Sequence, residues 1–374
     1  MAINAIMSVA GLSLDGRERA FLREADPWGI ILFGRNVQSP DQLRALTGEI
    51  RAALGRDAPI LVDQEGGRVQ RLTAPQWRQW LPPLDQVQAA LPLASAASVP
   101  AANAPPTGAR APEWSQSPDA PLTAPLSLID PAELARAERI FWLRSALIAA
   151  ELRAVGIDTN CAPGADVAHE NTHPFLRNRC LSDDPALVAR LARAIAEGLL
   201  AGGCLPVMKH MPGHGASTLD THFELPRVND DRDTLRTRDF APFKALNDLP
   251  MAMTGHLVFP AFDDAAPATQ SAQMIDVIRR EIGFDGLLMT DDIGMQALKG
   301  PVSERARASL AAGCDLVLHC NGVLSDSEQV AAVCQTLSGE AERRAQNALA
   351  LRPTAGQVDV KALDAEFAEL TGAT

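Results

Sequence analysis

"DDPALVARLARAIAEGLLAGG", residues 183–203, runs directly into "CLPVMKHMPG", residues 204–213, and this succession decides the fold. The first part has the apolar spacing of an amphipathic helix, with Asp at its start and Gly at its end, as helix capping favours. The second part is a short apolar run of the kind that forms a parallel strand covered on both faces. A helix followed at once by a buried strand is the repeating unit of an α/β fold.

Further apolar runs, each ending in polar residues or glycine, lie at 3–11, 28–36, 59–67, 156–166, 251–260, 286–292 and 315–322. Between them are helix-period segments at 39–54, 131–156, 271–283 and 303–313. Strands and helices that alternate in this way predict a single-domain (β/α)8 barrel of the TIM type. A doubly wound open sheet is the alternative, but it would usually carry a glycine-rich phosphate-binding turn after its first strand, and "SVAGLSLDG" is not one.

Two segments depart from this alternation. Residues 88–127 are dominated by Ala, Pro and Ser with little apolar periodicity, so we expect a flexible, low-complexity insertion that leaves the barrel. Residues from about 340 to 374 are expected to form a helical segment packed outside the barrel. With these two additions, we predict one domain that spans residues 1–374.

Composition narrows the classes of function. The formal net charge of −12 argues against nucleic acid as a partner, because neutralising phosphates needs clustered Lys and Arg. The N-terminus lacks the basic start and long apolar core of a signal peptide, and no apolar run reaches membrane-spanning length. We therefore expect a cytoplasmic monomer that acts on a small molecule, without a membrane partner. The six cysteines show no CxxC spacing, which favours buried free thiols.

The polar residues that end the apolar runs are the candidates for chemistry, because such a barrel builds its site at the carboxyl ends of its strands. The run "LLMTDD" ends in Asp291 and Asp292, and strand side chains alternate between faces, so we expect only one of them to point into the barrel mouth. The other should accept a hydrogen bond or cap a helix. A carboxylate facing a separate proton donor is the minimal equipment for retaining glycoside hydrolysis. The other candidates are Asp63, Glu65, Asp166, Lys209, His210 and His256.

The segment "KHMPGHGASTLDTHFELP", residues 209–226, contains His210, His214 and His222. A zinc motif of the HExxH kind needs two imidazoles on one helical face, and the Pro-Gly pair at 212–213 breaks any helix. A metal-dependent hydrolase with a loop-borne site on these three histidines stays as an alternative.

Several strings occur in the order "LVDQEGGRVQRL", "NRCLSDDP", "KHMPGHG" followed by "LDTH", "TGHLVFPAFD" and "GFDGLLMTDDIGM". Together they resemble the glycoside hydrolase family 3 β-N-acetylhexosaminidases, from about residue 5 to residue 335 and interrupted by the insertion. The resemblance implies removal of terminal β-linked N-acetylglucosamine with retention of configuration, and no metal or other cofactor. It also implies a cytoplasmic substrate from peptidoglycan recycling, N-acetylglucosamine joined to anhydro-N-acetylmuramic acid.

The resemblance further implies roles for single residues. Asp291 matches the nucleophile, His222 the general acid/base, and Asp220 the carboxylate that orients His222. The residues that match the sugar-binding positions are Asp63, Arg71, Arg179, Lys209 and His210. Arg177 is an alternative to Arg179, because both lie in "NTHPFLRNRCLSDDP".

The residue chemistry of the pair Asp220 and His222 agrees with these roles. A histidine with a pKa near ~6.5 both donates and accepts a proton around neutral pH, provided that a neighbour fixes its tautomer. The two residues lie at i and i+2, so in an extended segment their side chains leave the same face. Alternatives that stay open are a β-glucosidase-like or phosphorylase activity and a barrel that binds sugar without turnover.

Overall fold

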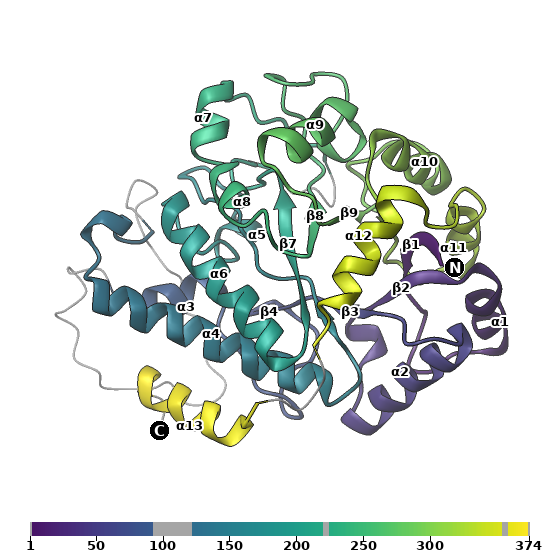
Figure 1. Cartoon of the computed structure of the whole chain (residues 1–374), viewed down its shortest axis with the longest axis horizontal. Coiled ribbons are helices and arrows are strands. Elements are labelled where there is room, and N and C mark those ends of the chain that lie inside the picture. Colours follow the sequence, from purple (N-terminus) through teal and green to yellow (C-terminus); the bar gives the residue numbers. More distant parts are fainter. Residues whose placement is uncertain (1, 93–121, 220–223, 354–357, 373–374) are drawn as a thin grey trace.

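The computed structural model describes residues 2–92, 122–219, 224–353 and 358–372. Its centre is a closed barrel of parallel strands in the order β1-β10-β9-β8-β7-β6-β3-β2 (Figure 1). The barrel strands are β1 (Ile3–Met7), β2 (Pro27–Leu32), β3 (Ile60–Val62), β6 (Thr159–Asn160), β7 (Leu205–Met211), β8 (Met251–Thr254), β9 (Leu287–Asp292) and β10 (Leu316–Leu318). Each predicted apolar run contains or overlaps one of these strands, so the (β/α)8 fold class is confirmed.

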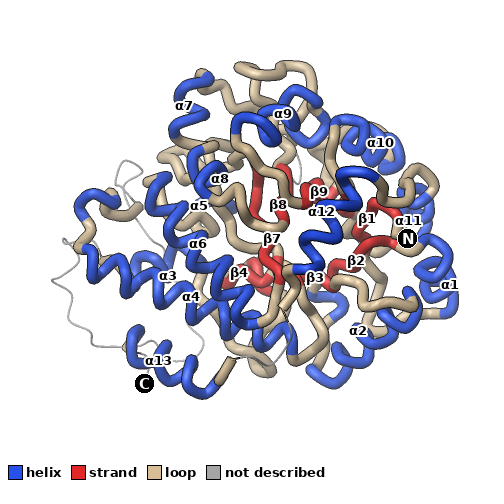
Figure 2. Tube along the Cα trace, viewed as in Figure 1, coloured by secondary structure: helices blue, strands red, loops and turns tan. Residues whose placement is uncertain are grey.

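Helices surround the strands (Figure 2). They are α1 (Gly16–Ala25), α2 (Pro40–Leu54), α3 (Pro83–Ala90), α4 (Pro131–Arg153), α5 (Pro174–Arg177), α6 (Pro185–Gly202), α7 (Arg232–Thr237), α8 (Ala241–Ala245), α9 (Ala272–Asp276), α10 (Val302–Ala312), α11 (Leu324–Ala331), α12 (Gly339–Ala350) and α13 (Val360–Thr371). The predicted segment 183–203 forms α6, whose N-cap Asp184 accepts two backbone hydrogen bonds and whose C-cap Gly203 is left-handed at φ 104°. The predicted segment 271–283 begins as α9 and continues as a π-helical turn.

Helix α6 packs closely on α4 and in turn lies against β7. Gly198 and Gly202 of α6 permit this approach, because a Cβ at these positions would collide with the backbone oxygens of Trp142 and Ala146 in α4. The strand β7 is thereby held between its barrel neighbours and a two-helix layer. This strand carries two of the residues predicted for the site.

The strands are apolar on both faces because both faces are buried. Val207 of β7 lies in the cluster that fills the barrel interior, together with Ile31 and Met289. The next residue, Met208, belongs instead to the outer cluster, which it shares with Leu191 of α6. The other barrel strands apart from β6 likewise contribute side chains to two cores, which explains their nearly continuous apolar runs.

Residues 93–121 of the expected insertion lie outside the described residues. The described parts of the range 88–127 are the end of α3 and a segment that contains a 3-10 turn at Leu126–Leu128. In the C-terminal segment, α12 and α13 are helical as expected, and α13 packs on α4. All six cysteines are free thiols, of which four are buried and two are partly exposed.

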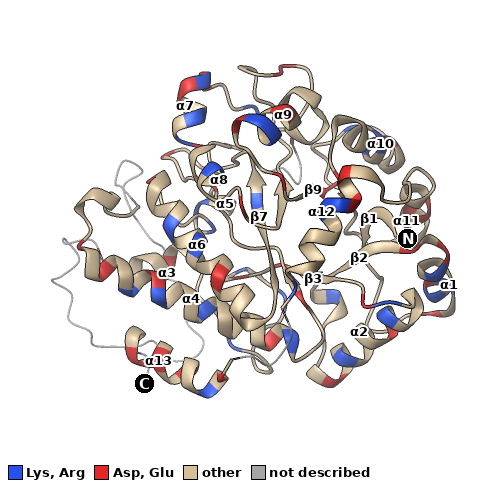
Figure 3. Cartoon of the chain, in the orientation of Figure 1, with Lys and Arg blue, Asp and Glu red and all other residues tan. Residues whose placement is uncertain are grey.

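The outer helices carry both signs of charge, as α1, α4 and α13 illustrate (Figure 3). Some of these side chains pair across neighbouring helices: Arg190 of α6 with Glu138 of α4, and Arg139 of α4 with Glu366 of α13. Among the described helices, none combines the length and the apolar character needed to cross a membrane.

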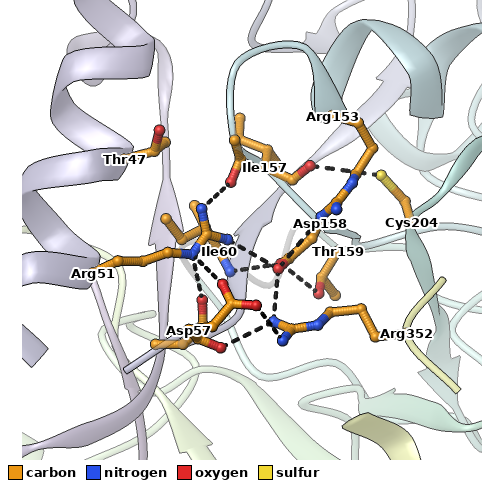
Figure 4. Close-up of polar contacts among 12 residues, drawn as sticks. Thr47, Arg51, Asp57, Ile60, Arg153, Ile157, Asp158, Thr159, Cys204 and Arg352 are labelled. Carbon is orange, nitrogen blue, oxygen red and sulfur yellow. Dashed lines mark hydrogen bonds and ion pairs between the residues drawn. The ribbon is translucent and has the colours of Figure 1, made fainter. Parts of the chain in front are cut away.

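At the amino-terminal end of the barrel lies an ionic cluster around Asp158, which is buried and directly precedes β6 (Figure 4). Its Oδ1 accepts a hydrogen bond from the backbone N–H of Ile60 at 2.8 Å. Its Oδ2 accepts from Arg51 of α2 and from Arg352, which follows α12, both at 2.9 Å. The two arginines also share Asp57. Asp158 therefore joins α2, β3 and the chain after α12 at one point.

Candidate active site

A cavity of about 150 Å³ lies at the carboxyl ends of the barrel strands. Of the residues predicted for the site, those that line it are Asp63, Arg71, Arg179, Lys209, His210 and Asp291. The other two, Asp220 and His222, lie outside the residues that the structure describes. Arg177 does not line the cavity, and its guanidinium donates to the backbone oxygen of Glu170. Of the two arginines between which the sequence left a choice, Arg179 is therefore the one at the cavity.

Lys209 lies at the centre of the polar wall, and only 2% of its side chain is exposed. Its Nζ donates to Asp63 Oδ1 at 2.8 Å, and the other oxygen of Asp63 accepts from Arg71 at 3.1 Å. Burial raises the pKa of Asp63, but the charges of Lys209 and Arg71 outweigh it and hold that pKa well below its usual range. Burial lowers the pKa of Lys209, and Asp63 and Glu65 more than offset it, so the ammonium stays charged.

A short hairpin after β3, made of β4 (Gln64–Gly66) and β5 (Val69–Gln70), carries Arg71 to the cavity. Gly66 is left-handed at φ 109°, and a Cβ there would collide with the guanidinium of Arg144. Arg144 comes from α4, is buried, and donates to the backbone oxygen of Glu65 at 2.7 Å. The string "DQEGGRVQR" therefore encodes a turn built around an arginine that the sequence motifs did not single out.

Glu65 links two of the cations on the cavity wall. Arg179 donates to both of its carboxylate oxygens, from Nε at 3.0 Å and from Nη2 at 2.8 Å. Lys209 Nζ lies 2.6 Å from Glu65 Oε1. Burial raises the pKa of Glu65, but the charges of Arg179 and Lys209 outweigh it and lower the pKa to about 2. Sequence reasoning included Glu65 among the strand-end acids and gave it no role in the site.

His210 is held by Asp166, which lies in the segment after β6. The two side chains meet at 2.7 Å through His210 Nδ1, and Asp166 Oδ1 accepts from the backbone N–H of His214 at 2.7 Å. Burial raises the pKa of Asp166, but these histidines outweigh it and lower the pKa to about 2, so the carboxylate accepts and Nδ1 carries the proton. His210 Nε2 lies 3.5 Å from Arg179 Nη2, and the imidazole lines the cavity. His214 also lines the cavity.

Asp291 and Asp292 end β9, and both line the cavity. The expectation that only one would face the barrel mouth is wrong, because a bulge in β9 between Met289 and Asp292 interrupts the alternation of the strand. As expected, one of them is used structurally: Asp292 Oδ1 accepts from the backbone N–H groups of Gly294 at 2.9 Å and Cys320 at 3.1 Å. Asp291 Oδ1 accepts only from the N–H of Asp292, at 2.8 Å, among the described residues.

The environments of the two acids push their pKa values apart. Burial raises the pKa of Asp291, but the charges of His210 and His256 and the hydrogen bond from Asp292 outweigh it, so the pKa falls below its usual range. Burial, with the adjacent charge of Asp291, raises the pKa of Asp292. Asp291 is therefore the acid of the pair that ionises more readily, which suits an attacking or charge-stabilising group.

Comparison with known proteins gives a family for this site. The description "Glycosyl hydrolase family 3 N terminal domain" matches residues 136–350. A β-hexosaminidase of Alkalilimnicola ehrlichii is 36% identical over 322 residues, which cover 84% of this chain and 80% of that protein. The chain belongs to glycoside hydrolase family 3. It is a glycoside hydrolase of the β-N-acetylhexosaminidase type, as the sequence strings indicated.

Other members of the family agree in sequence and in fold. A β-hexosaminidase of Stenotrophomonas maltophilia strain R551-3 is 36% identical over 86% of this chain and 84% of its own. The crystal structure of native NagZ from Neisseria gonorrhoeae has a TM-score of 0.78 at 30% identity, over 99% of this chain and 97% of that one. The same protein in complex with N-trifluoroacetyl-D-glucosamine also gives a TM-score of 0.78, at 29% identity over 99% of this chain and 98% of that one.

In this family 3 hydrolase, His256 lies one layer below the cavity and does not line it. Its Nε2 donates to the backbone oxygen of Asp292 at 3.0 Å, and its Nδ1 meets Thr269 Oγ1 at 2.8 Å. The imidazole therefore holds the end of β9, where both acids are carried. The position of His256 at a strand end was visible in the sequence, but its partner Thr269 was not.

No three His, Cys, Asp or Glu side chains in the described ranges are grouped so that they would hold a metal ion. The three-histidine alternative includes His222, which lies outside those ranges, so it stays a prediction. In the described part, the Nδ1 atom of His210 is engaged by Asp166.

Proposed function

We propose that this family 3 hydrolase releases terminal β-linked N-acetylglucosamine with retention of configuration, through a covalent glycosyl-enzyme on Asp291. The observation that supports this most is the position of Asp291. It is a half-buried, ionised carboxylate at the carboxyl end of β9, and it shares one small cavity with Lys209 and Arg179. A nucleophile and a fixed set of polar groups around one sugar-sized space suit glycoside cleavage.

Sugar binding is assigned to the polar wall of Asp63, Arg71, Arg179, Lys209 and His210. The carboxylate oxygens of Asp63 keep free lone pairs that suit sugar hydroxyl groups, while the cations supply N–H donors. The imidazole of His210 lies beside them. The complex of the Neisseria gonorrhoeae relative with N-trifluoroacetyl-D-glucosamine supports an N-acylated glucosamine as the ligand class.

In the proposed reaction, Asp291 attacks the anomeric carbon while protonated His222 gives its proton to the leaving oxygen. The aglycone departs as an alcohol, and the sugar stays esterified to Asp291. Neutral His222 then takes a proton from water, whose oxygen attacks the same carbon and releases Asp291 as a carboxylate. Asp220 holds the imidazole of His222 and stabilises its charged form. Two inversions at one carbon leave the configuration unchanged.

By family resemblance, we propose a peptidoglycan fragment as the natural substrate, N-acetylglucosamine joined to anhydro-N-acetylmuramic acid, and recycling in the cytoplasm as its setting. The two relatives named β-hexosaminidase come from bacteria, which build cell walls of peptidoglycan. This finer assignment rests on the resemblance, and it requires no catalytic or sugar-binding residues beyond those already named.

A trapping experiment tests the proposal. A fluorinated N-acetylglucosaminide with a good leaving group should add one sugar mass to the protein, and peptide mapping should place it on Asp291. The first product from a chromogenic β-N-acetylglucosaminide, followed by NMR, should be the β-anomer. An α-anomer or a label on another residue would contradict the mechanism, and binding without product would indicate a sugar-binding barrel. Sugar 1-phosphate formed in phosphate buffer would indicate a phosphorylase.

A further inference from the structure

We propose that Glu65 is a positioning residue of this active site: it directs the N–H groups of Lys209 and Arg179 into the cavity without touching the sugar. The inference rests on the proposed function in one respect, that these two cations bind the substrate. Glu65 is absent from the residues that line the cavity, although both of its partners line it. Its side chain is 4% exposed.

The hydrogen-bond geometry of Arg179 supports this role. Glu65 accepts from Nε at 3.0 Å and from Nη2 at 2.8 Å, which engages one edge of the planar guanidinium. Because the group is rigid, a pair of bonds along one edge fixes where the other edge points. The Nη1 atom of Arg179 is thereby oriented away from Glu65. A single contact would leave the guanidinium free to rotate.

Lys209 shows the same effect with a smaller group. Its Nζ donates a hydrogen bond to Asp63 at 2.8 Å, and Glu65 Oε1 lies 2.6 Å from the same nitrogen as an ion-pair partner. An ammonium has three N–H donors, so the two carboxylates set its position and donors remain for a ligand. Without Glu65, the ammonium would rotate about its bond to Cε and would present its remaining donors in several directions.

Charge balance gives Glu65 a second effect on the same two cations. Lys209, Arg179 and Arg71 lie at one wall, and Asp63 and Glu65 are the acids that pair with them there. Replacing Glu65 by a neutral residue leaves three cations with one acid beside a reaction whose transition state is itself positively charged. Excess positive charge would therefore oppose the chemical step as well as misdirect the donors.

The surroundings of Glu65 hold it in place. Its backbone oxygen accepts from Arg144 Nη2 at 2.7 Å, and the following Gly66 lies against the same guanidinium. Arg144 is 3% exposed and comes from α4, outside the barrel. Arg144 therefore holds the backbone at Glu65, and the carboxylate of Glu65 in turn holds the two cations.

The test is the variant Glu65→Gln, which keeps the shape and removes the charge. We expect kcat/KM to fall about 100-fold, as for a displacement of binding groups by about 1 Å, with KM raised about tenfold. The affinity for N-acetylglucosamine, measured by calorimetry, should fall with it. A purely structural role would lower the amount of folded enzyme, counted by the covalent trap, and would leave KM and this affinity unchanged, which would overturn the inference.

The matched control is Glu151→Gln, the same change in α4. Glu151 accepts from Trp80 at 3.4 Å and does not line the cavity, so its KM and kcat should stay within about twofold. Should Glu65→Gln fail to fold, Glu65→Asp keeps the charge but withdraws it from the edge of Arg179. It should raise KM in the same direction by a smaller factor, and an unchanged KM would overturn the inference.

A double-mutant cycle tests whether Glu65 acts through its direct partner Arg179 or through a general change in the site. In an Arg179→Lys background, Glu65→Gln should cost much less than in the wild type, because the edge-on bonds are already lost. Full additivity would count against positioning through Arg179.

If wild-type enzyme hydrolyses N-acetylglucosaminides and Glu65→Gln binds and turns over normally, the Glu65 inference fails alone. If the wild type does not hydrolyse them, the proposed function fails, and the calorimetric affinities still decide on Glu65.

Discussion

The two ends of the barrel each bury acids among several arginine or lysine side chains, but they leave the cations in different states. At the amino-terminal end, Asp158 receives the backbone N–H of Ile60 and the guanidinium groups of Arg51 and Arg352 (Figure 4). At the carboxyl end, Lys209 and Arg179 are held on one side by acids and border a cavity on the other. The first cluster is closed, whereas the second keeps donors for a ligand.

This difference teaches how one kind of ion pair serves two purposes. A buried pair whose partners saturate one another ties elements together, and breaking it leaves an uncompensated charge. A pair whose cation keeps unpaired N–H groups contributes to binding instead. In barrels of this class, the carboxyl end carries the chemistry and the amino end carries stability. The variants below test whether the two ends separate in this way.

The largest effect is expected at the carboxyl end, from Asp291→Ala. Removing the proposed nucleophile should lower kcat on a chromogenic N-acetylglucosaminide by at least about 10⁴-fold, while the thermal midpoint of unfolding stays close to that of the wild type. Steady-state kinetics and calorimetric scanning measure the two quantities. Retained turnover would remove Asp291 from the mechanism, and a large loss of stability would blur the distinction between the ends.

At the amino end, Asp158→Asn should have the opposite signature. Among the described residues, Arg51 and Arg352 would then keep only the exposed Asp57 as an ion-pair partner, and Arg153 would lose its ion pair. The free energy of unfolding should therefore fall by about 3–5 kcal/mol. Values of kcat and KM should remain unchanged. Chemical denaturation followed by intrinsic fluorescence measures the loss.

Asp248→Asn is the control for this change, because Asp248 pairs with Arg193 at the surface. Exposed pairs contribute about 0–1 kcal/mol, so this variant should unfold nearly as the wild type does. If the two variants lose the same free energy of unfolding, burial does not explain the contribution of the amino-terminal cluster to stability. If Asp158→Asn lowers kcat in folded protein, the two ends are coupled.

The smallest effect is expected in the pH dependence of stability, to which His214 at the carboxyl end of the barrel contributes. Burial, with the charge of His210, lowers the pKa of His214 to about 3, whereas an unfolded histidine titrates near ~6.5. Between these values the unfolded state binds a proton that the folded state excludes, so stability falls as the pH falls from about 6.5, by at most about 1.4 kcal/mol per pH unit. In His214→Gln this slope between pH 6.5 and 5 should become shallower. An unchanged slope in urea titrations would show that His214 is not the source.

Most of the fold was predictable because its signals are local. A strand buried on both faces needs a continuous apolar run, and each predicted run became a barrel strand. Helix α6 was equally clear, since Asp184 and Gly203 mark its two ends. The hairpin β4–β5 was missed, because two such short strands leave almost no periodicity. The expectation for Asp292 was wrong because it assumed regular alternation across a bulge in β9.

Most residues of the site could be predicted from the sequence, but the hydrogen bonds and ion pairs between them could not. Asp63, Lys209 and Asp291 could be found at the ends of apolar runs, and they do meet at one cavity. The bonds from Arg179 to Glu65 span 114 positions, and no local pattern encodes such a pairing. Arg144 looks like an ordinary polar position of a helix until the fold brings Gly66 against it. The roles of Asp220 and His222 stay predictions, because these residues lie outside the described ranges.

The closure of the barrel between β1 and β10 has a consequence for synthesis of the chain. Ala5 pairs with Val317, so one of the first strands to leave the ribosome waits for the last strand before its second edge is covered. Pairing partners so distant in sequence make closure slow and expose strand edges meanwhile. A nascent or truncated chain that stops before β10 would keep open edges at β1 and β9, where other chains can add. Those two edges therefore need protection during translation, whereas in the folded enzyme they are covered by strand pairing.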